Sequence, residues 1–402
     1  METLKYDFTK TGDFEMKVTT FFGLEEILSS ELQKLGGKNV SVFKRGASVT
    51  GDIGFLYKIN LCLHSALKVL VPLTGFTAES EQQLYDKVKE IPWEKFISVT
   101  DRIMIESVLN SEIFSHSLFV SQKVKDAIAD RFREKTGRRP DVDLVHPTFK
   151  LYVHVYKNEV NISLDSSGDP LYKRGYRADI NEAPMKEVLA AGLVKLSGWE
   201  PHLLLVDGMC GAGTIAIEAA LWANNIPPGY YRNNFVFMRW QNFDEKLYDV
   251  VYESAINKIK NDKVEIIANE IDANTFRKAQ GNVKNAKVED SVRCNHESFF
   301  DLKVERKSGV VILNPPYNER MPVEETEKLY KEIGDKLKKD FKNFAAWIIT
   351  SAPEGVKSVG LRPSRKIQLY NGSLDCRYLK YELYEGTKKI HKLRDKEGLD
   401  PQ

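Results

Sequence analysis

The segment Asn314-Pro315-Pro316-Tyr317 follows the apolar strand pattern Val310–Leu313 and carries residue types suited to one kind of chemistry. The side-chain carbonyl of Asn314 and the backbone carbonyl of Pro315 can accept both hydrogens of an exocyclic amine on a nucleobase. Accepting both aims the nitrogen lone pair at an electrophile, and the prolines fix this geometry beforehand. Tyr317 offers an aromatic face to a flipped-out base. Two prolines that only ended a strand would require neither Asn314 nor Tyr317. The segment therefore indicates methylation of a base amine, in adenine or guanine and in DNA or RNA.

A glycine-rich turn, Asp207-Gly-Met-Cys-Gly-Ala-Gly-Thr, lies between a strand pattern and a helix pattern. Its glycines allow a sharp turn and close approach of a ligand, and the helix N-terminus beyond them favours an anionic group. A dinucleotide-binding turn would require an acidic residue about 20 positions on; Glu270, the acid after the next strand, comes much later. Asp207 favours S-adenosylmethionine instead. The aspartate can bind the ammonium group of this cofactor, and the helix N-terminus can bind its carboxylate. Glu270 can accept hydrogen bonds from its ribose hydroxyls.

Composition limits the class of protein. The chain has 402 residues, enough for two or three domains, with 42% hydrophobic residues and a net charge of +2. A nucleic-acid surface must therefore be local. No apolar run approaches the roughly 20 residues that span a bilayer, and the first residues lack the apolar core of a signal peptide. The four cysteines form no CxxC pair, so we expect no zinc or other metal site, and a reducing cytoplasmic location.

The pattern along the chain changes near residue 183. Before it, short strands and helices mix in an α+β pattern, with the apolar stretch 53–70 expected to be helical. After it, strands alternate with helices, which predicts a parallel sheet covered on both faces. Asn371-Gly372 between two strand patterns predicts a closing antiparallel hairpin.

Two basic stretches are candidates for RNA contact. The first lies within 121–150 and includes Arg138 and Arg139; a solvated helix face also accounts for its modest excess of charge. The second is a turn-rich linker in which Lys173, Arg174 and Arg177 interleave with tyrosines. Such a pattern suits phosphates and stacked bases, or an ordinary polar connector.

With these motifs in view, the chain resembles the THUMP-domain RNA guanine-N2 methyltransferases of the bacterial large-subunit ribosomal RNA type. The resemblance covers nearly the whole chain. It rests on four segments: Leu171-Tyr-Lys-Arg-Gly-Tyr-Arg with Ala183-Pro-Met-Lys-Glu, the glycine turn, Asn225-Ile-Pro-Pro-Gly with Trp240-x-x-Phe-Asp, and Asn314-Pro-Pro-Tyr-Asn-Glu-Arg. Some relatives carry a second methyltransferase domain at the C-terminus, for which this chain is too short. The residue that contacts adenine after the third strand stays open between Glu297 and Ser298.

The resemblance implies an α/β class I methyltransferase fold: a Rossmann-like, seven-stranded sheet with an antiparallel C-terminal hairpin, preceded by ferredoxin-like and THUMP domains. The expected boundaries are 1–75 for the ferredoxin-like domain, 76–166 for THUMP, 167–185 for a linker, 186–388 for the methyltransferase domain and 389–402 for a tail. The implied cofactor is S-adenosylmethionine, and the implied acceptor is a guanine N2 amine in RNA, most plainly ribosomal RNA. Other substrates kept open are tRNA guanine and DNA adenine N6, and a non-catalytic RNA-binding assembly factor is the alternative from another class. Oligomeric state is not indicated.

The site residues expected from the motifs and the resemblance fall into three groups. The catalytic residues are Asn314, Pro315, Pro316 and Tyr317. The cofactor-binding residues are Asp207, Gly208, Cys210, Gly211, Gly213, Thr214, Glu270 and Ile271. The RNA-binding residues are Lys173, Arg174, Arg177, Arg138 and Arg139.

Overall fold

The computed structural model describes residues 5–6, 8, 12–177, 185–316 and 322–385. It divides into two units whose segments interleave along the chain. Unit 1 comprises 1–20, 28–173 and 232–257, and unit 2 comprises 21–27, 174–231 and 258–402. Among the described residues, no helix is long and apolar enough to cross a membrane.

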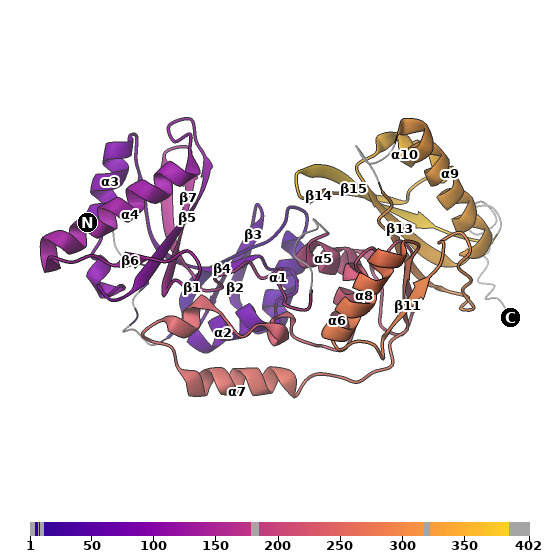
Figure 1. Cartoon of the computed structure of the whole chain (residues 1–402), viewed down its shortest axis with the longest axis horizontal. Helices are drawn as coiled ribbons and strands as arrows, with labels where there is room; N and C mark the ends of the chain where they lie inside the picture. Colours follow the sequence, from indigo (N-terminus) through magenta and orange to yellow (C-terminus); the bar gives the residue numbers. More distant parts are fainter. Residues whose placement is uncertain (1–4, 7, 9–11, 178–184, 317–321, 386–402) are drawn as a thin grey trace. The chain divides into compact units, whose positions relative to one another are not determined.

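Unit 1 is built on a mixed sheet of eight strands in the order β2-β3-β1-β4-β8-β7-β5-β6 (Figure 1). Its helices share one apolar core with the sheet, in which Val18, Val71 and Val153 from the strands meet Leu32 and Ile128 from the helices. The elements are β1 (Phe14–Thr19), α1 (Glu25–Lys34), β2 (Lys38–Phe43), β3 (Gly46–Gly51), α2 (Ile53–Cys62), β4 (Lys68–Thr77), α3 (Glu81–Glu90), η1 (Trp93–Lys95), β5 (Arg102–Asn110), α4 (Ser117–Thr136), β6 (Asp141–Val142), β7 (Phe149–Tyr156), β8 (Glu159–Asp165), η3 (Val236–Arg239) and α7 (Glu245–Ile256).

Strand β4 corrects the expectation that 53–70 is helical throughout, because the helix ends at Cys62 and a strand begins at Lys68. Proline is rare inside sheets since it donates no ladder hydrogen bond, and Pro72 lies in the middle of β4. The register of β4 against β8 shifts between Pro72 and Thr74, a local irregularity that accommodates the proline. The expected domain boundary near residue 75 falls inside this strand, which belongs to one continuous sheet.

The segment 232–257 follows a helix of unit 2 in the sequence yet packs in unit 1. Phe237 stacks on Tyr57 with ring centroids 4.7 Å apart, and Trp240 meets Phe8 edge-on at 5.7 Å. Asp244 caps α7 by accepting a hydrogen bond from the backbone N–H of Leu247. These aromatic contacts make the segment part of the core of unit 1.

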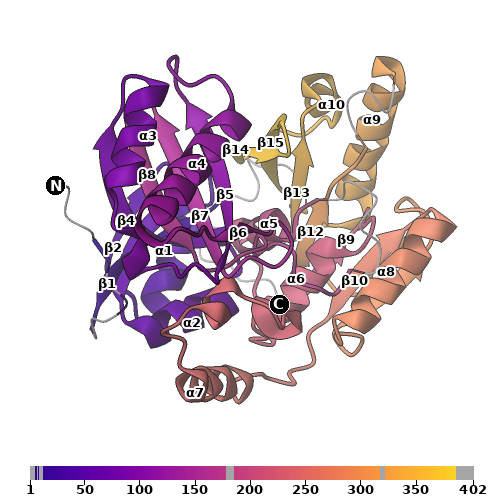
Figure 2. The ribbon, with the colours of Figure 1, turned by 60° about the vertical axis from the view of Figure 1, so that its left-hand side comes forward.

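Unit 2 contains a seven-stranded sheet in the order β11-β10-β9-β12-β13-β15-β14. The pairs formed by β11, β10, β9, β12 and β13 are parallel, and β13-β15-β14 are antiparallel, which confirms the expected α/β sheet with a closing hairpin. Figure 2 shows the helices of unit 2 packed along this sheet. The elements are α5 (Glu187–Ser197), β9 (Leu204–Asp207), α6 (Thr214–Ala223), η2 (Pro228–Tyr231), β10 (Ile266–Glu270), α8 (Ala273–Asn285), β11 (Val292–His296), β12 (Gly309–Leu313), α9 (Val323–Asp340), β13 (Phe344–Thr350), α10 (Pro353–Ser358), β14 (Arg365–Asn371) and β15 (Leu374–Glu382).

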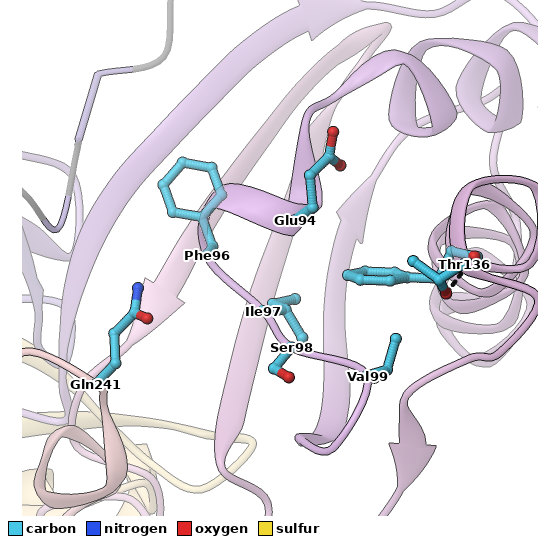
Figure 3. A pocket seen from close by; sticks show the side chains of 8 residues that line it. Glu94, Phe96, Ile97, Ser98, Val99, Thr136 and Gln241 are labelled. Atoms are coloured by element: carbon cyan, nitrogen blue, oxygen red, sulfur yellow. Dashed lines mark hydrogen bonds between the residues drawn. The ribbon is translucent and has the colours of Figure 1, made fainter.

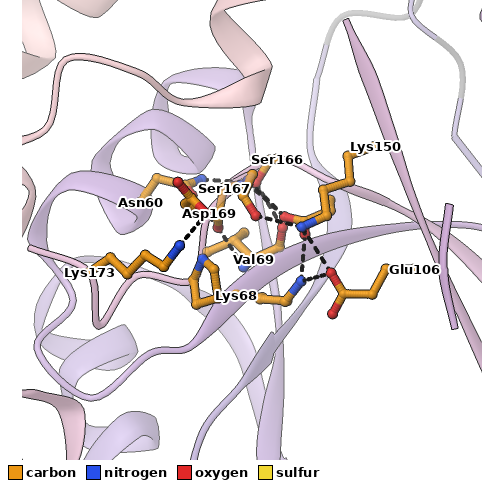
Figure 4. A network of polar contacts seen from close by, with 12 residues as sticks. Asn60, Lys68, Val69, Glu106, Lys150, Ser166, Ser167, Asp169 and Lys173 are labelled. Atoms are coloured by element: carbon orange, nitrogen blue, oxygen red, sulfur yellow. Dashed lines mark hydrogen bonds and ion pairs between the residues drawn. The ribbon is translucent and has the colours of Figure 1, made fainter. Parts of the chain in front are cut away.

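Four charged side chains from four adjacent strands form a cluster in unit 1 (Figure 4). The Lys68 ammonium lies 2.8 Å from Glu106 and 2.9 Å from Asp165, and the Lys150 ammonium lies 2.9 Å from Glu106. Asp165 is fully buried and also accepts hydrogen bonds from the backbone N–H groups of Ser167 and Gly168, each 3.0 Å long. The cluster therefore ties β4, β5, β7 and β8 together through paired charges.

Replacing Asp165 by asparagine is expected to destabilise unit 1 by about 3 kcal/mol, because it leaves two largely buried ammonium groups with a single carboxylate. Chemical denaturation measures the change. The matched control is Asp143→Asn, whose partner Arg102 is half-exposed and whose loss is expected to cost less than about 1 kcal/mol. Equal losses at the two positions would contradict a stabilising role for the buried cluster.

Candidate active site

The glycine turn joins β9 to α6 at the middle of the sheet in unit 2. Gly211 and Gly213 have φ values of 55° and 79°, in the left-handed region that favours glycine. A Cβ on Gly208 would lie 2.6 Å from the Leu313 side chain, so β12 allows no side chain there. A Cβ on Gly211 would meet no atom within 4 Å. The turn thus packs tightly against the sheet at Gly208 and leaves free space for a ligand at Gly211.

Asp207, the last residue of β9, is fully buried. Neither of its carboxylate oxygens has a hydrogen bond of normal geometry within the described part of the chain; the backbone N–H of Ala216 lowers its pKa but does not outweigh burial. Burial, with a further contribution from the nearby charge of Glu270, raises the pKa of Asp207 to about 8. A buried carboxylate without partners is costly, so this residue is suited to a cationic or hydrogen-donating ligand.

Three neighbouring strand ends carry the candidate polar groups. Ala268 of β10 and Ile312 of β12 are both register partners of Asp207, and Glu270 and Asn314 each lie two residues further along their strands. Because the strands are parallel, all three side chains belong to the same carboxyl edge of the sheet. In open α/β sheets this edge is where ligands bind.

Glu270 is held in place by two backbone amides. The N–H of Gly211 donates to one carboxylate oxygen and the N–H of Asp272 to the other, each at 2.9 Å. The next side chain, Ile271, is 67% exposed. An oriented carboxylate beside an exposed apolar side chain can receive a group that is polar on one edge and flat and apolar on its face.

Asn314 follows β12 directly, and its side-chain oxygen is buried without a hydrogen-bond partner among the described residues. Pro315 is buried and Pro316 is exposed. Tyr317 lies outside the described residues. Buried acceptors without partners are rare in proteins, so this carbonyl is available to an N–H group of a bound molecule.

Arg174 and Arg177 have partners inside unit 2. Arg174 is 1% exposed, and its guanidinium bonds to the buried carboxylate of Glu218 at 3.3 Å. Arg177 donates to the Thr214 hydroxyl at 2.7 Å and lies 3.1 Å from the carboxylate of Glu187. These arginines therefore connect α6 to the linker through hydrogen bonds and ion pairs. Their side chains are engaged inside unit 2 and are not proposed as RNA contacts.

The remaining predicted basic residues lie at the surface of unit 1. Arg138 and Arg139 are exposed in the turn after α4. Lys173 forms an exposed ion pair of 2.9 Å with Asp169. Their roles in RNA contact stay predictions.

Two asparagines that the sequence analysis did not single out hold the glycine turn. Asn269, adjacent to Glu270, donates from its side chain to the backbone carbonyls of Gly208 at 3.3 Å and Glu297 at 3.1 Å. Asn282 of α8 donates to the Ala212 carbonyl at 3.0 Å. A polar Asn inside the otherwise apolar pattern of β10 is the sequence signal that could have identified the first of them.

A cavity of about 290 Å³ lies in unit 1, and none of these residues lines it (Figure 3). Glu94 lines it together with apolar side chains such as Phe96. Two hydrogen bonds from Arg131, with a further one from Lys135, hold the pKa of the Glu94 carboxylate at about 2. Its charge is therefore already paired with these two basic side chains. No cluster of metal-ligating side chains occurs within the described ranges.

The strand order of unit 2 and the polar groups at its carboxyl edge define a methyltransferase of the class I fold. Comparison with known proteins agrees. Residues 174–380 match the RMKL-like methyltransferase domain, 78–165 match the THUMP domain and 15–70 match the RlmL ferredoxin-like domain. The chain belongs to the RMKL-like methyltransferase family.

Individual relatives extend this result. The Synechocystis protein slr0064, provisionally named an RNA methyltransferase, is 34% identical over 90% of this chain and 95% of its own length. The ribosomal RNA large subunit methyltransferase K/L of Syntrophotalea carbinolica is 35% identical over 90% of this chain. This chain spans 53% of that relative's length. The crystal structure of SMU.472, provisionally assigned as a methyltransferase and solved with SAH, superposes with a TM-score of 0.83 at 28% identity, covering 94% of this chain and all of that one.

The raised pKa of Asp207 predicts how stability depends on pH. The unfolded chain loses this proton near the ordinary value of 3.8, whereas the folded protein keeps it until about pH 8. The free energy of unfolding therefore falls as pH rises through this window. Asp207→Asn removes the titration, so we expect the variant to match the wild type near pH 4 and to exceed it by roughly 5 kcal/mol near pH 8, since each unit of pKa difference corresponds to about 1.4 kcal/mol. Chemical denaturation of the ligand-free protein at several pH values measures the difference. A pH-independent difference would exclude Asp207 as its origin.

Proposed function

We propose that this protein transfers a methyl group from S-adenosylmethionine to the exocyclic N2 amine of a guanine in RNA, with large-subunit ribosomal RNA as the substrate. The observation that carries the proposal is the buried side-chain oxygen of Asn314, which has no hydrogen-bond partner among the residues that the structure describes. It lies two residues beyond the register partner of Asp207, at the same sheet edge. The names of the K/L relatives support the choice of ribosomal RNA.

The residues around the glycine turn fit S-adenosylmethionine. Asp207 offers two buried acceptor oxygens to its ammonium, Glu270 offers an oriented carboxylate to its ribose hydroxyls, and exposed Ile271 offers an apolar contact to its adenine. Gly211 leaves open space beside them. When bound, the cofactor supplies an electrophilic methyl group on a sulfonium.

The chain's own part in the reaction is to prepare the acceptor amine. The nitrogen of a base amine is a poor nucleophile because its lone pair is delocalised into the ring. The side-chain oxygen of Asn314 and the backbone carbonyl of Pro315 accept its two N–H groups and direct the lone pair out of the ring plane. The two prolines limit the backbone to this arrangement, so the orientation does not have to be selected during the reaction.

A direct test uses ribosomal RNA from cells lacking the gene, incubated with purified protein and methyl-labelled S-adenosylmethionine, followed by mass analysis of the nucleosides. Labelled N2-methylguanosine is the expected product. In a parallel reaction with duplex DNA, labelled N6-methyladenosine together with unlabelled RNA would replace the proposal with the DNA alternative. No transfer and no cofactor binding by calorimetry would favour the non-catalytic assembly factor.

Asn314→Ala is expected to lower turnover by about a hundredfold or more, a loss comparable to removing one preorganised hydrogen-bonding group from an active site. Cofactor affinity is expected to stay within about threefold, because Asn314 faces the acceptor amine. Radiolabel transfer measures the first quantity and isothermal titration the second. Asn274→Ala, at an exposed position on α8, is the matched control. A parallel loss of turnover and cofactor affinity would assign Asn314 a structural role.

A further inference from the structure

Strands β5, β7 and β8 of unit 1 have two chemically different faces. On one face of β7, Phe149, Leu151 and Val153 are buried in the core. Figures 1 and 2 both show helices α3 and α4 along one side of these strands. The alternate residues of β7 point to the opposite face, where Tyr156 is 48% exposed and His154 is also exposed.

The register of the three strands shows which residues share the opposite face. Tyr152, His154 and Tyr156 of β7 pair with Glu106, Val108 and Asn110 of β5 and with Ser163, Asn161 and Glu159 of β8. Val108 is 42% exposed. We use the term aromatic face for the surface formed by Val108, Tyr152, His154, Tyr156 and Asn161.

The rings are spaced for bases that do not stack on one another. Side chains two residues apart on one strand are separated by about 6.6–6.8 Å. This is about twice the 3.4 Å rise per nucleotide within a duplex strand. A chain of nucleotides that placed a base on each of Tyr152, His154 and Tyr156 would therefore have to be unstacked and extended.

Lysine ammonium groups lie over two of these rings. The Lys157 ammonium is 5.7 Å from the centroid of the Tyr156 ring, and the Lys68 ammonium is 5.4 Å from that of Tyr152. Partial desolvation of the exposed His154 ring, with a contribution from the nearby charge of Lys17, lowers the pKa of its imidazole from the ordinary value, which favours the uncharged ring.

The acidic groups on this face are largely neutralised or peripheral. Glu106 is bonded to Lys68 and Lys150 within the buried cluster, and the Asp165 carboxylate is paired in the same cluster. Glu159 lies at the hairpin end, opposite Tyr156. The charge left to Lys17 and Lys157 complements phosphates, and aromatic rings beside a positively charged groove are the combination that binds single-stranded nucleic acid.

We propose that the aromatic face binds an unpaired, extended segment of the RNA that this protein methylates, with bases stacked on Tyr152, His154 and Tyr156. The inference rests on the proposed function. Stacking on aromatic side chains of a sheet is a general mode of single-stranded RNA binding and tolerates many sequences. A duplex keeps the faces of its bases covered, so this surface selects single strands.

The test compares the double variant Tyr152→Ala/Tyr156→Ala with the wild type, using fluorescence anisotropy on a short, mixed-sequence single-stranded RNA and on a duplex of the same sequence. We expect the dissociation constant for the single strand to rise about tenfold or more and that for the duplex to stay unchanged. Tyr156→Phe is expected to retain affinity, because the ring remains. With ribosomal RNA, KM is expected to rise while the single-turnover rate at saturating RNA is preserved.

The matched control is Phe119→Ala on α4, another aromatic residue with a lysine over its ring, Lys123 at 5.6 Å. It is expected to bind the single strand like the wild type. Thermal unfolding of all variants identifies any that fail to fold, and Tyr156→Ala alone then replaces the double variant.

Several outcomes would overturn the inference while the wild type still methylates ribosomal RNA. They are unchanged single-strand affinity in the tyrosine variants, an equal loss in Phe119→Ala, or an equal loss for duplex RNA. A change in self-association by sedimentation, without a change in RNA affinity, would assign the face to a second copy of the chain. Failure of the wild type to methylate any RNA would instead reject the proposed function.

Discussion

The candidate site depends on the parallel register of three neighbouring strands. Asp207 pairs with Ala268 on one side and with Ile312 on the other, so a single alignment brings the ends of β10, β9 and β12 to one edge. A shift of one residue in either pair would turn Glu270 or Asn314 to the other face of the sheet. The chemistry of the site is therefore set by backbone hydrogen bonds far more than by the loops themselves.

The same edge carries buried polar groups that have no hydrogen-bond partner among the described residues. Asp207 and Asn314 both place polar oxygens in the interior without partners among the described residues. Hydrogen bonds of the neighbouring residues stabilise the backbone around these two side chains. Asn269 and Asn282 fix the backbone of the glycine turn, and Arg177 bonds to the first residue of α6. A site with unsatisfied acceptors inside a well-bonded frame is preorganised for a ligand that donates hydrogen bonds.

The sequence was most informative where local chemistry and strand pattern coincide. An apolar run that ends in Asn314-Pro-Pro or in Asp207-Gly can be read without knowing the rest of the fold, because the strand itself brings its end to the sheet edge. It was least informative about β4, where Pro72 and a continuous apolar run concealed a strand. The arginines of the linker were also ambiguous, since a basic residue in a turn-rich segment has the same signature whether it contacts solvent or, like Arg174, a buried carboxylate.

The two units interleave along the chain, so each is assembled from segments that are not contiguous in the sequence. Phe235, Phe237 and Trp240 belong to the core of unit 1, although they follow α6 of unit 2 in the sequence, and 21–27 belongs to unit 2 although β1 precedes it. Each unit thus completes its own packing with a segment supplied from the other side of a boundary. The two units are consequently joined by several chain crossings.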